Sequence, residues 1–222
     1  KFFIPNNILF PKEEVVKFLN RYIRKLIDKN RYKDLIITES GLIKGLDFGC
    51  GFGRQTILMK EFHIDAYGCD ISSVAIDHAQ KLSNLYGFDD LKNKFIVIND
   101  DKLNFENDFF NFSIAEACLD SMEFELAKKL IKEIARVTQE YIFFSVISGD
   151  DDHDDGSFSD DLTVNTEHEF GTIQSYYTYN KICDLISDID FQIVYCRETK
   201  VSGYIKEKKS FSSRFYVVIK RQ

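Results

Sequence analysis

Apolar runs of strand length alternate along the chain with segments of helical spacing, and this alternation restricts the fold more than any other feature. Five runs are predicted to be strands: Leu42–Phe48, Asp65–Cys69, Lys94–Ile98, Phe112–Cys118 and Tyr141–Ile147. The helical segments between them are Gln55–Phe62, Ser73–Tyr86 and Glu123–Val137. Strands that are joined through helices run parallel in one sheet. We therefore predict an α/β fold with a doubly wound, mostly parallel sheet that helices cover on both faces.

The two ends of the chain add a helix and a hairpin to this core. Pro11 and the charged residues after it indicate a helix start, and the apolar residues that follow share one face: Val15, Val16, Leu19, Tyr22, Ile23 and Leu26. Near the other end, a helix at about Tyr179–Ser187 precedes two apolar runs, Phe191–Arg197 and Arg214–Lys220. No helix separates these runs, so we expect them to pair antiparallel at the edge region of the sheet.

Length and composition suit a single globular domain. The chain has 222 residues, of which 44% are hydrophobic and 29% charged. The mainly apolar run Tyr141–Ile147 is far shorter than the roughly 20 residues that span a bilayer, so we expect no membrane span. Residues Lys1–Phe10 lack the pattern of a secretory signal, and we expect a cytoplasmic location.

Net charge and cysteine usage exclude further classes. A net charge of −7 repels a phosphate backbone, so a nucleic-acid substrate is not expected. The five cysteines form no C-x-x-C pair, which argues against a zinc site and a disulfide framework. We expect them to be buried thiols: Cys50, Cys69, Cys118, Cys183 and Cys196.

A glycine-rich segment joins the first predicted strand to its helix, with the sequence Leu46-Asp47-Phe48-Gly49-Cys50-Gly51-Phe52-Gly53-Arg54. Glycines let such a turn adopt positive φ and let a ligand approach where a Cβ would otherwise stand. A dinucleotide-binding loop would require glycine at position 54, which is Arg54, and the Gly-Lys-Ser/Thr of a Walker loop is absent.

This turn resembles motif I of the class I S-adenosylmethionine-dependent methyltransferases, D-x-G-C-G-x-G, with Asp47 and Gly49–Gly53 in the matching positions. The resemblance covers about Asn6–Val146. It implies a Rossmann-like, seven-stranded sheet, S-adenosylmethionine as cofactor and S-adenosylhomocysteine as product. The sequence departs from the family at Phe110-Asn111-Phe112, where the family has F-D-x-V, and at Thr138-Gln139-Glu140, where it often has a proline-glycine turn.

The resemblance also implies the residues that bind the cofactor. Asp70, which lies 17 positions after Gly53, would accept hydrogen bonds from the two ribose hydroxyls, and Asp100 would meet the adenine amino group. Glu116–Asp120 matches the segment beneath the methionine moiety. Arg54 either pairs with the cofactor carboxylate or is a helix-surface arginine. The predicted cofactor-binding set is Asp47, Gly49, Cys50, Gly51, Gly53, Arg54, Asp70, Ile71, Asp100, Asp101, Glu116 and Ala117.

In this family frame, residues 1–222 form one methyltransferase domain. Residues 1–40 are an N-terminal cap helix region, in which Asn6 and Asn7 resemble a short motif that folds over the cofactor. Residues 41–148 are the cofactor-binding core, 149–178 a loop or lid with the acceptor region, and 179–222 the last helix and C-terminal hairpin.

The acceptor side is expected after the fifth strand, because ligands of open α/β sheets bind at the carboxyl ends of the strands. An imidazole titrates near neutrality, which makes His168 a candidate catalytic base, and Glu169 would orient or replace it. The alternative is a surface histidine beside solvated acids. Tyr176 and Tyr177 either line the acceptor pocket or pack under the last helix, and His78 is interpreted as an exposed helix residue.

Two charged segments are further candidates for a binding role. Gly149–Asp161 is nearly all Asp, Gly and Ser and is expected to be a solvated loop or lid. No register of it supplies both the glycine and the glutamate of a calcium loop, so no metal site is predicted. A basic group around the final hairpin either attracts an anionic acceptor or forms a solvated face: Lys200, Lys206, Lys208, Lys209 and Arg214.

The sequence thus predicts a methyltransferase that acts on a small molecule. The resemblance suggests an oxygen acceptor, such as a sugar or a phosphorylated intermediate of bacterial surface (capsular) polysaccharide modification. Two alternatives remain open: a protein or peptide methyltransferase, which would need a broad acidic groove, and a cofactor-binding scaffold without turnover. Formation of S-adenosylhomocysteine with candidate acceptors would separate the enzymes from the scaffold.

Overall fold

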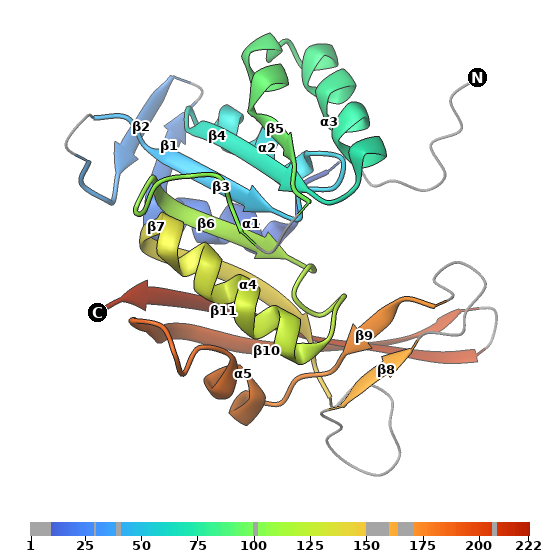
Figure 1. The fold of residues 1–222 in the computed structure, drawn as a ribbon. Coiled ribbons are helices and arrows are strands. Elements are labelled where there is room, and N and C mark those ends of the chain that lie inside the picture. The colour runs from blue at the N-terminus through green and yellow to red at the C-terminus, as the bar shows by residue number, and fades with distance from the viewer. Residues whose placement is uncertain are drawn as a thin grey trace. The chain divides into compact units, whose positions relative to one another are not determined.

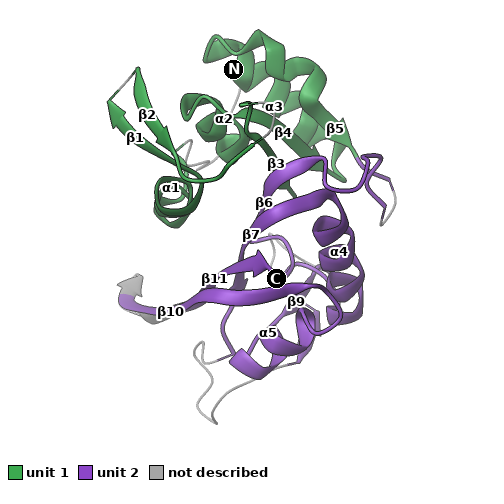
Figure 2. Ribbon diagram, turned by 90° about the vertical axis from the view of Figure 1, so that its left-hand side faces the viewer, with its two compact units in different colours: residues 1–97 green, residues 98–222 purple. Residues whose placement is uncertain are grey.

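The structure is a computed structural model that describes residues 10–28, 30–38, 41–99, 102–149, 160–163, 171–205 and 208–222. The chain divides into two compact units, residues 1–97 and residues 98–222 (Figure 2). Strands and helices alternate in both units in the predicted order (Figure 1).

Unit 1 contains three parallel strands in the order β3-β4-β5. Their bounds are β3 (Lys44–Phe48), β4 (Asp65–Asp70) and β5 (Phe95–Val97). The connections are α2 (Arg54–Glu61), α3 (Ser73–Leu85) and the 3₁₀-helix η2 (Asp89–Lys94). Ser72 begins α3 as an N-cap, because its hydroxyl accepts a hydrogen bond from the Ala75 N–H at 3.2 Å.

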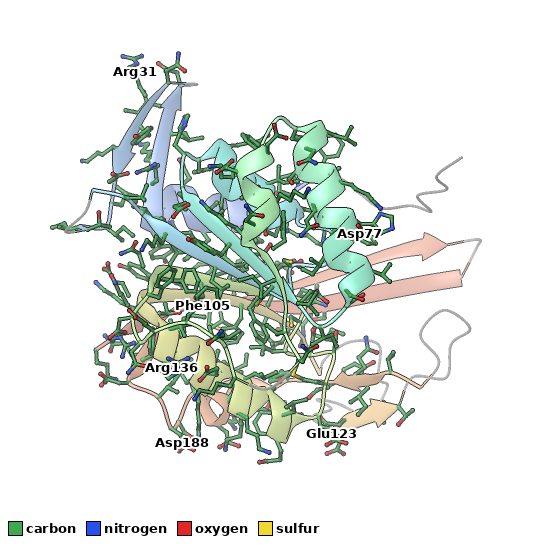
Figure 3. The ribbon with its side chains drawn as sticks, turned by 45° about the horizontal axis from the view of Figure 1, so that its top comes forward. Arg31, Asp77, Phe105, Glu123, Arg136 and Asp188 are labelled. Atoms are coloured by element: carbon green, nitrogen blue, oxygen red, sulfur yellow. The ribbon has the colours of Figure 1, made fainter. Side chains whose placement is uncertain are left out.

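The N-terminal helix begins where predicted but ends earlier. α1 (Glu13–Phe18) continues as the π-helix η1 (Leu19–Ile23), after which β1 (Arg24–Asp28) and β2 (Arg31–Asp34) form an antiparallel hairpin with Arg31 near its tip (Figure 3). The predicted continuation of the helix to Leu26 is therefore wrong.

The side chain of Arg24 accounts for this early end. It is only 2% exposed, and its guanidinium donates to Asp34 Oδ2 at 3.0 Å and to the Phe62 carbonyl at 3.2 Å. It also stacks on the Tyr32 ring at 3.9 Å. A buried guanidinium needs such acceptors, and the hairpin brings Asp34 and Tyr32 to it. This requirement is met through contacts distant in sequence, which helical periodicity does not reveal.

Unit 2 has the strand order β10-β11-β7-β6. β6 and β7 are parallel, whereas β11 is antiparallel to β7 and β10 is antiparallel to β11. The bounds are β6 (Phe110–Glu116), α4 (Phe124–Val137), β7 (Thr138–Ile147), α5 (Tyr179–Leu185), β10 (Phe191–Ile205) and β11 (Lys208–Arg221). A short antiparallel hairpin, β8 (Asp161–Thr163) with β9 (Ile173–Ser175), was not predicted from the sequence.

The final hairpin is antiparallel as predicted but much longer. β10 has 15 residues and β11 has 14, and the two pair from Phe191 with Arg221 to Ile205 with Lys208. Only Arg214–Lys220 of β11 also pairs with β7. The seven strands of the two units, mostly parallel and with this C-terminal hairpin, confirm the predicted fold class.

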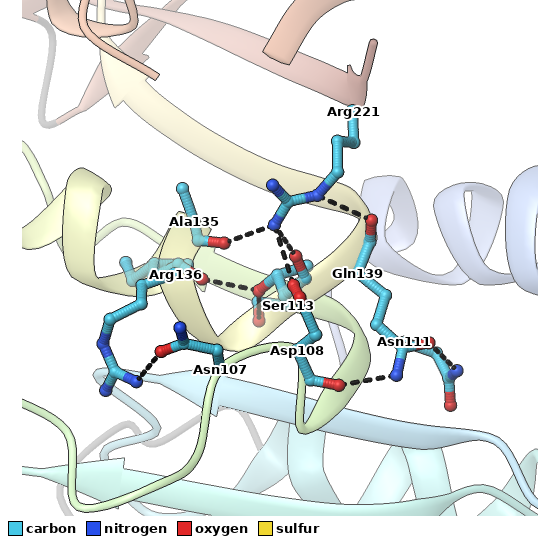
Figure 4. A network of polar contacts seen from close by, with 10 residues as sticks. Asn107, Asp108, Asn111, Ser113, Ala135, Arg136, Gln139 and Arg221 are labelled. Carbon is cyan, nitrogen blue, oxygen red and sulfur yellow. Dashed lines mark hydrogen bonds and ion pairs between the residues drawn. The ribbon is translucent and has the colours of Figure 1, made fainter. Parts of the chain in front are cut away.

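A polar network attaches the end of β11 to the start of β7 (Figure 4). Arg221 donates from Nε to the Gln139 carbonyl at 2.9 Å and from Nη2 to the Ala135 carbonyl at 2.8 Å, and it pairs with Asp108 at 3.0 Å. The Asn111 amide donates to Gln139 Oε1 at 2.7 Å. The Asn111 departure from the family pattern is thus part of the packing.

A second polar cluster attaches the loop before β6 to α4. Arg136 donates to the carbonyls of Phe105 and Leu103, each at 2.9 Å, and to Glu133 Oε1 at 2.6 Å (Figure 3). The same Glu133 oxygen accepts from the Leu103 N–H at 2.7 Å. Lys132 on α4 pairs at 2.7 Å with Asp188, which follows α5.

The cysteine prediction is right for two residues and wrong for the others. Cys50 and Cys69 are buried, Cys118 and Cys196 are half-buried, and Cys183 is exposed. Cys183 comes one residue after the fully buried Ile182 on the short helix α5, a rotation of about 100° that takes its side chain away from the buried face. None of the described helices has the length and apolar character that crossing a bilayer requires.

Candidate functional site

The glycine turn of unit 1 is held by the neighbouring strand. The N–H groups of Gly49 and Cys50 both donate to the Cys69 carbonyl, at 2.8 and 2.9 Å. Gly49, Gly51 and Gly53 have φ angles of 70°, 52° and 79°, a region that favours glycine. The predicted turn is therefore present, and three of its five residues have the backbone conformation for which glycine is suited.

The space around Gly51 differs from that around Gly53. A Cβ at Gly51 would meet nothing within 4 Å, whereas one at Gly53 would come within 2.8 Å of the Phe95 ring and 3.0 Å of the Ala79 Cβ. Gly53 therefore permits close packing of the turn on α3 and β5. Gly51 leaves open space beside the backbone, which suits the close approach of a ligand.

Asp70, at the end of β4, binds this turn. Its Oδ2 accepts the Gly51 N–H at 2.8 Å, and its Oδ1 accepts the Ser72 N–H at 2.9 Å. Each carboxylate oxygen retains a second lone pair, so the side chain keeps acceptor capacity for a diol. The adjacent Ile71, which the sequence also assigns to the cofactor, is 79% exposed.

Asp47, in β3 just before the turn, and Cys50, within the turn, are both buried. Asp47 is 1% exposed and accepts a hydrogen bond from the Thr56 hydroxyl at 2.7 Å, which links β3 to α2. Burial raises the pKa of the Cys50 thiol well above its usual value, and the nearby Asp47 charge adds to this shift. The Cys50 thiol is therefore neutral near pH 7, and the role of Asp47 and Cys50 in cofactor binding remains a prediction.

Arg54 and His78 occupy the helices of unit 1. Arg54 is the first residue of α2 and lines a pocket of about 250 Å³ together with Phe10, Leu82 and Tyr86, among others. Its pairing with the cofactor carboxylate remains a prediction. His78 is half-buried, with its ring 5.2 Å from the Phe52 ring, so the expectation of an exposed residue was wrong.

In unit 2, polar groups gather at the carboxyl ends of β6 and β7. Glu116 ends β6 in a buried position, and Ala117 has a φ of 51° while its N–H donates to the Ser145 hydroxyl at 3.0 Å. Asp120 is 1% exposed and accepts the Ile147 N–H at 2.9 Å. Strand ends of this kind carry the ligand sites of open α/β sheets.

Arg214 of β11 completes this group. Its Nη1 donates to Asp120 Oδ2 at 2.8 Å and to Ser145 Oγ at 3.3 Å. Burial raises the pKa of Asp120, and the guanidinium charge opposes that shift. The sequence places Asp120 in the methionine-side segment and Arg214 in a basic cluster, but it carries no signal for their pairing or for Ser145.

Tyr177 fixes the same segment from below. It is fully buried, and its hydroxyl donates to the Leu119 carbonyl at 3.1 Å. Its ring lies 5.9 Å from that of Phe124, and burial raises the pKa of its phenol. Of the two interpretations offered by the sequence, packing is therefore correct for Tyr177. Tyr176 is half-buried and donates to Gln174 Oε1 at 3.1 Å.

Several predicted residues lie outside the part of the chain that the structure describes. They are Asn6, Asn7, Asp100, Asp101, the acidic run 150–156, His168 and Glu169. Their roles remain predictions. Within the described ranges, no group of three or more His, Cys, Asp or Glu side chains is arranged to hold a metal ion.

Comparison with known families decides the class of the protein. The sequence profile of the family described as "Methyltransferase domain" matches residues 46–142, which include the glycine turn, Asp70 and the β6 segment. Residues 46–142 of the chain form a methyltransferase domain. Enzymes of this class take their methyl group from S-adenosylmethionine. No curated protein matches the sequence at a significant level.

Solved structures share the fold of this methyltransferase at low sequence identity. An S-adenosylmethionine-dependent methyltransferase from Methanosarcina mazei is 22% identical with a TM-score of 0.65, and the match covers 83% of this chain and 94% of that one. A protein that converts a disulfide bond into a thioacetal in echinomycin biosynthesis is 15% identical with a TM-score of 0.68, over 98% and 85% of the two chains.

A third solved structure contains the cofactor. Magnesium protoporphyrin IX methyltransferase from Synechocystis PCC 6803 with bound S-adenosylmethionine is 16% identical, with a TM-score of 0.56 over 82% of this chain and 71% of that one. At such identities the likeness extends to the fold, and the acceptor of this methyltransferase has to be inferred from its own residues.

Proposed function

We propose that this methyltransferase acts on an oxygen atom of a small molecule, such as a sugar or a phosphorylated intermediate of surface polysaccharide modification. The observation that carries the cofactor half of the proposal is the open space at Gly51 beside the Asp70 carboxylate. A ligand with a ribose diol fits this combination, because it needs close backbone approach and two carboxylate acceptors.

We assign different roles in cofactor binding to the residues in and beside the turn. Gly49, Gly51 and Gly53 shape the backbone, Asp47 supports it through Thr56, and Asp70 accepts from the ribose hydroxyls. We assign the methionine side to Glu116 and Ala117, and the adenine side to Asp100 and Asp101, as the family resemblance implies. Bound S-adenosylmethionine supplies a methyl group on a sulfonium, which an acceptor attacks in line.

The acceptor half of the proposal rests on the polar groups at the ends of β6 and β7. Asp120, Ser145 and Arg214 are held there by hydrogen bonds, and the family uses this edge of the sheet for ligands. His168 and Glu169 are the proposed base for a hydroxyl acceptor. An acceptor oxygen that is already ionised needs no base. Two of the structural neighbours are named for small-molecule chemistry, the formation of a thioacetal in echinomycin biosynthesis and the methylation of magnesium protoporphyrin IX, which supports a small-molecule acceptor.

Calorimetry with and without S-adenosylhomocysteine tests the cofactor half. At 100 times its dissociation constant a ligand adds about 2.7 kcal/mol to the free energy of unfolding, which is roughly 5 to 11 °C in Tm for a chain of this length. We expect this rise with S-adenosylhomocysteine and none with NAD. Stabilisation by NAD alone would contradict the assignment.

Methyl transfer tests the acceptor half. The protein is incubated with S-adenosylmethionine labelled in the methyl group, together with separate pools of sugars, sugar phosphates and basic peptides. We expect label in a sugar or sugar-phosphate pool, in equal amount to the S-adenosylhomocysteine that is formed. Label in the peptide pool alone would favour a protein methyltransferase, and cofactor binding without label in any pool would favour a scaffold.

A further inference from the structure

Arg214 uses only one nitrogen of its guanidinium for the protein. Its Nη1 donates to Asp120 Oδ2 at 2.8 Å and to Ser145 Oγ at 3.3 Å. No hydrogen bond within the described ranges engages Nε or Nη2, which together carry three N–H groups. The side chain is 21% exposed, so part of it contacts solvent.

Two other arginines of the chain have a guanidinium that the protein engages at all three nitrogens. Arg24 donates from Nε and Nη2 to Asp34 and from Nη1 to two carbonyls. Arg136 donates from Nε, Nη1 and Nη2 to Glu133, Asn107 and two carbonyls. Each of them satisfies all three nitrogens within the protein. Arg214 is anchored through Nη1, and none of the described residues accepts a hydrogen bond from its Nε or Nη2.

The anchor of Arg214 is unusually well fixed. Asp120 is 1% exposed and also accepts the Ile147 N–H at 2.9 Å, while Ser145 also accepts the Ala117 N–H at 3.0 Å. Arg214 pairs across the sheet with Ile147, the last residue of β7. These contacts fix the guanidinium at the carboxyl ends of β6 and β7, where the acceptor of the proposed reaction is expected.

We infer that Arg214 is a specificity residue that binds an anionic oxygen group of the methyl acceptor, through Nε and Nη2. The planar fork matches two oxygens of one phosphate or one carboxylate, and such bidentate pairs are directional and strong. The inference deepens the proposed function and rests on it. It narrows the acceptor from small molecules in general to those that carry a phosphate or carboxylate near the methylated atom.

The test follows the side-chain N–H signals of arginine in protein labelled with ¹⁵N-arginine, with and without S-adenosylhomocysteine. Inorganic phosphate and acetate are titrated separately at constant ionic strength, so that the two sources of the anionic group are distinguished. The Arg214 signal is assigned by its absence in Arg214→Lys. We expect a saturable shift of this signal with at least one of the two anions.

Three variants make the result specific. Arg214→Gln and Arg214→Lys are expected to weaken anion binding at least tenfold and severalfold, because both lose the fork. Lys200→Gln removes the same charge from the neighbouring strand, where Lys200 lies 3.6 Å from Glu198, and is expected to change binding less than twofold. Circular dichroism and the affinity for S-adenosylhomocysteine establish that each variant is folded.

Two outcomes overturn the inference. One is a wild-type Arg214 signal that does not shift, and the other is a loss in Lys200→Gln as large as in Arg214→Gln, which would indicate a general positive field. In both cases binding of S-adenosylhomocysteine would leave the proposed function intact. Failure of the wild-type protein to bind S-adenosylhomocysteine contradicts the proposed function instead, and the two failures are thereby distinguished.

Discussion

At the scale of single residues, the glycine turn shows that one residue type serves two different physical needs. Gly53 is required by packing, since a side chain there would collide with Phe95 and Ala79. Gly51 has a similar left-handed backbone conformation, but a Cβ at this position would have no neighbour within 4 Å. Substitution of each glycine by alanine therefore separates stability from ligand binding.

Gly53→Ala is expected to lower the free energy of unfolding by about 2 to 5 kcal/mol, since left-handed backbone costs roughly 1 to 2 and overpacking roughly 1 to 3 kcal/mol. Gly51→Ala should cost only about 1 to 2 kcal/mol but weaken S-adenosylhomocysteine binding at least tenfold, because its methyl group occupies the open space. Denaturant unfolding and calorimetry measure both. Equal stability losses in the two variants would contradict this division.

Asp70→Ala should weaken cofactor binding more than tenfold, because hydrogen bonds to a charged group contribute about 1.5 to 3 kcal/mol each. Asp70→Asn keeps one oxygen acceptor and should lie between alanine and wild type. Asp77→Asn, on the exposed face of α3, removes the same charge and should leave the affinity unchanged. An unchanged affinity in Asp70→Ala, measured by calorimetry, would remove Asp70 from the ribose site.

At this scale the sequence predicts residues well when their role is local. Asp70 is the last residue of β4 and the glycine spacing is that of the turn itself, so the positions of both could be predicted from local patterns, whereas the ribose role of Asp70 remains to be tested. The pairing of Asp120 with Arg214 joins residues 94 positions apart, and no local pattern reports it. The predictions for Asp100 and Asp101, and for His168 and Glu169 as the base, remain to be tested.

At the scale of elements, the strands and helices of the core match the prediction because the spacing of their apolar residues is that of the structure they form. The errors occur where polar residues form strands. β1, β2 and β8 have mostly exposed residues and therefore no alternating apolar pattern. The long extension of β10 and β11 is formed by pairing between these two strands, and its residues Val201, Ser202 and Gly203 are exposed.

The ion pair between Glu133 and Arg136 supports α4 and gives a pH-dependent prediction. The hydrogen bond from Arg136 lowers the pKa of Glu133 below its usual value of 4.5. A carboxylate whose pKa is lower in the folded state than in the unfolded state stabilises the fold at pH values above its unfolded pKa. This stabilisation is lost as the pH falls through the folded pKa. Glu133→Gln should therefore cost about 1 to 3 kcal/mol at pH 7 and progressively less below pH 4.5.

Urea unfolding of Glu133→Gln across this pH range measures the effect. Glu125→Gln serves as the control, since Glu125 is exposed on the same helix and should change the free energy of unfolding little at any pH. A loss in Glu133→Gln that stays constant from pH 7 to pH 3 would show that the carboxylate charge contributes nothing.

At the scale of the whole molecule, Arg221 connects the end of β11 to the start of β7. Arg221→Ala removes its donations to the Gln139 and Ala135 carbonyls, and we expect a loss of about 2 kcal/mol, or roughly 4 to 8 °C in Tm. Lys220→Ala is the matched control, because the Lys220 side chain is 40% exposed and its contacts are an ion pair with Glu140 at 3.3 Å and the Tyr141 ring at 5.2 Å. Equal melting temperatures of the two variants would contradict a structural role for Arg221.

Removal of metal ions tests whether turnover depends on a bound ion. The acidic run at 150–156 fits no complete calcium-loop pattern, and the described residues contain no metal-binding group of three or more ligands. Treatment with a chelator should therefore leave turnover unchanged. A loss of turnover that added magnesium restores would make these aspartates candidate ligands.

The position of β11 in the sheet has a consequence for the synthesis of the protein. β11 lies between β10 and β7, although the ribosome makes it after both. β10 therefore has no partner strand in unit 2 while β11 is still being translated. During that interval the apolar residues of β10 are open to contact with other chains. Slower translation of the codons for Lys208–Arg221 would prolong this exposure.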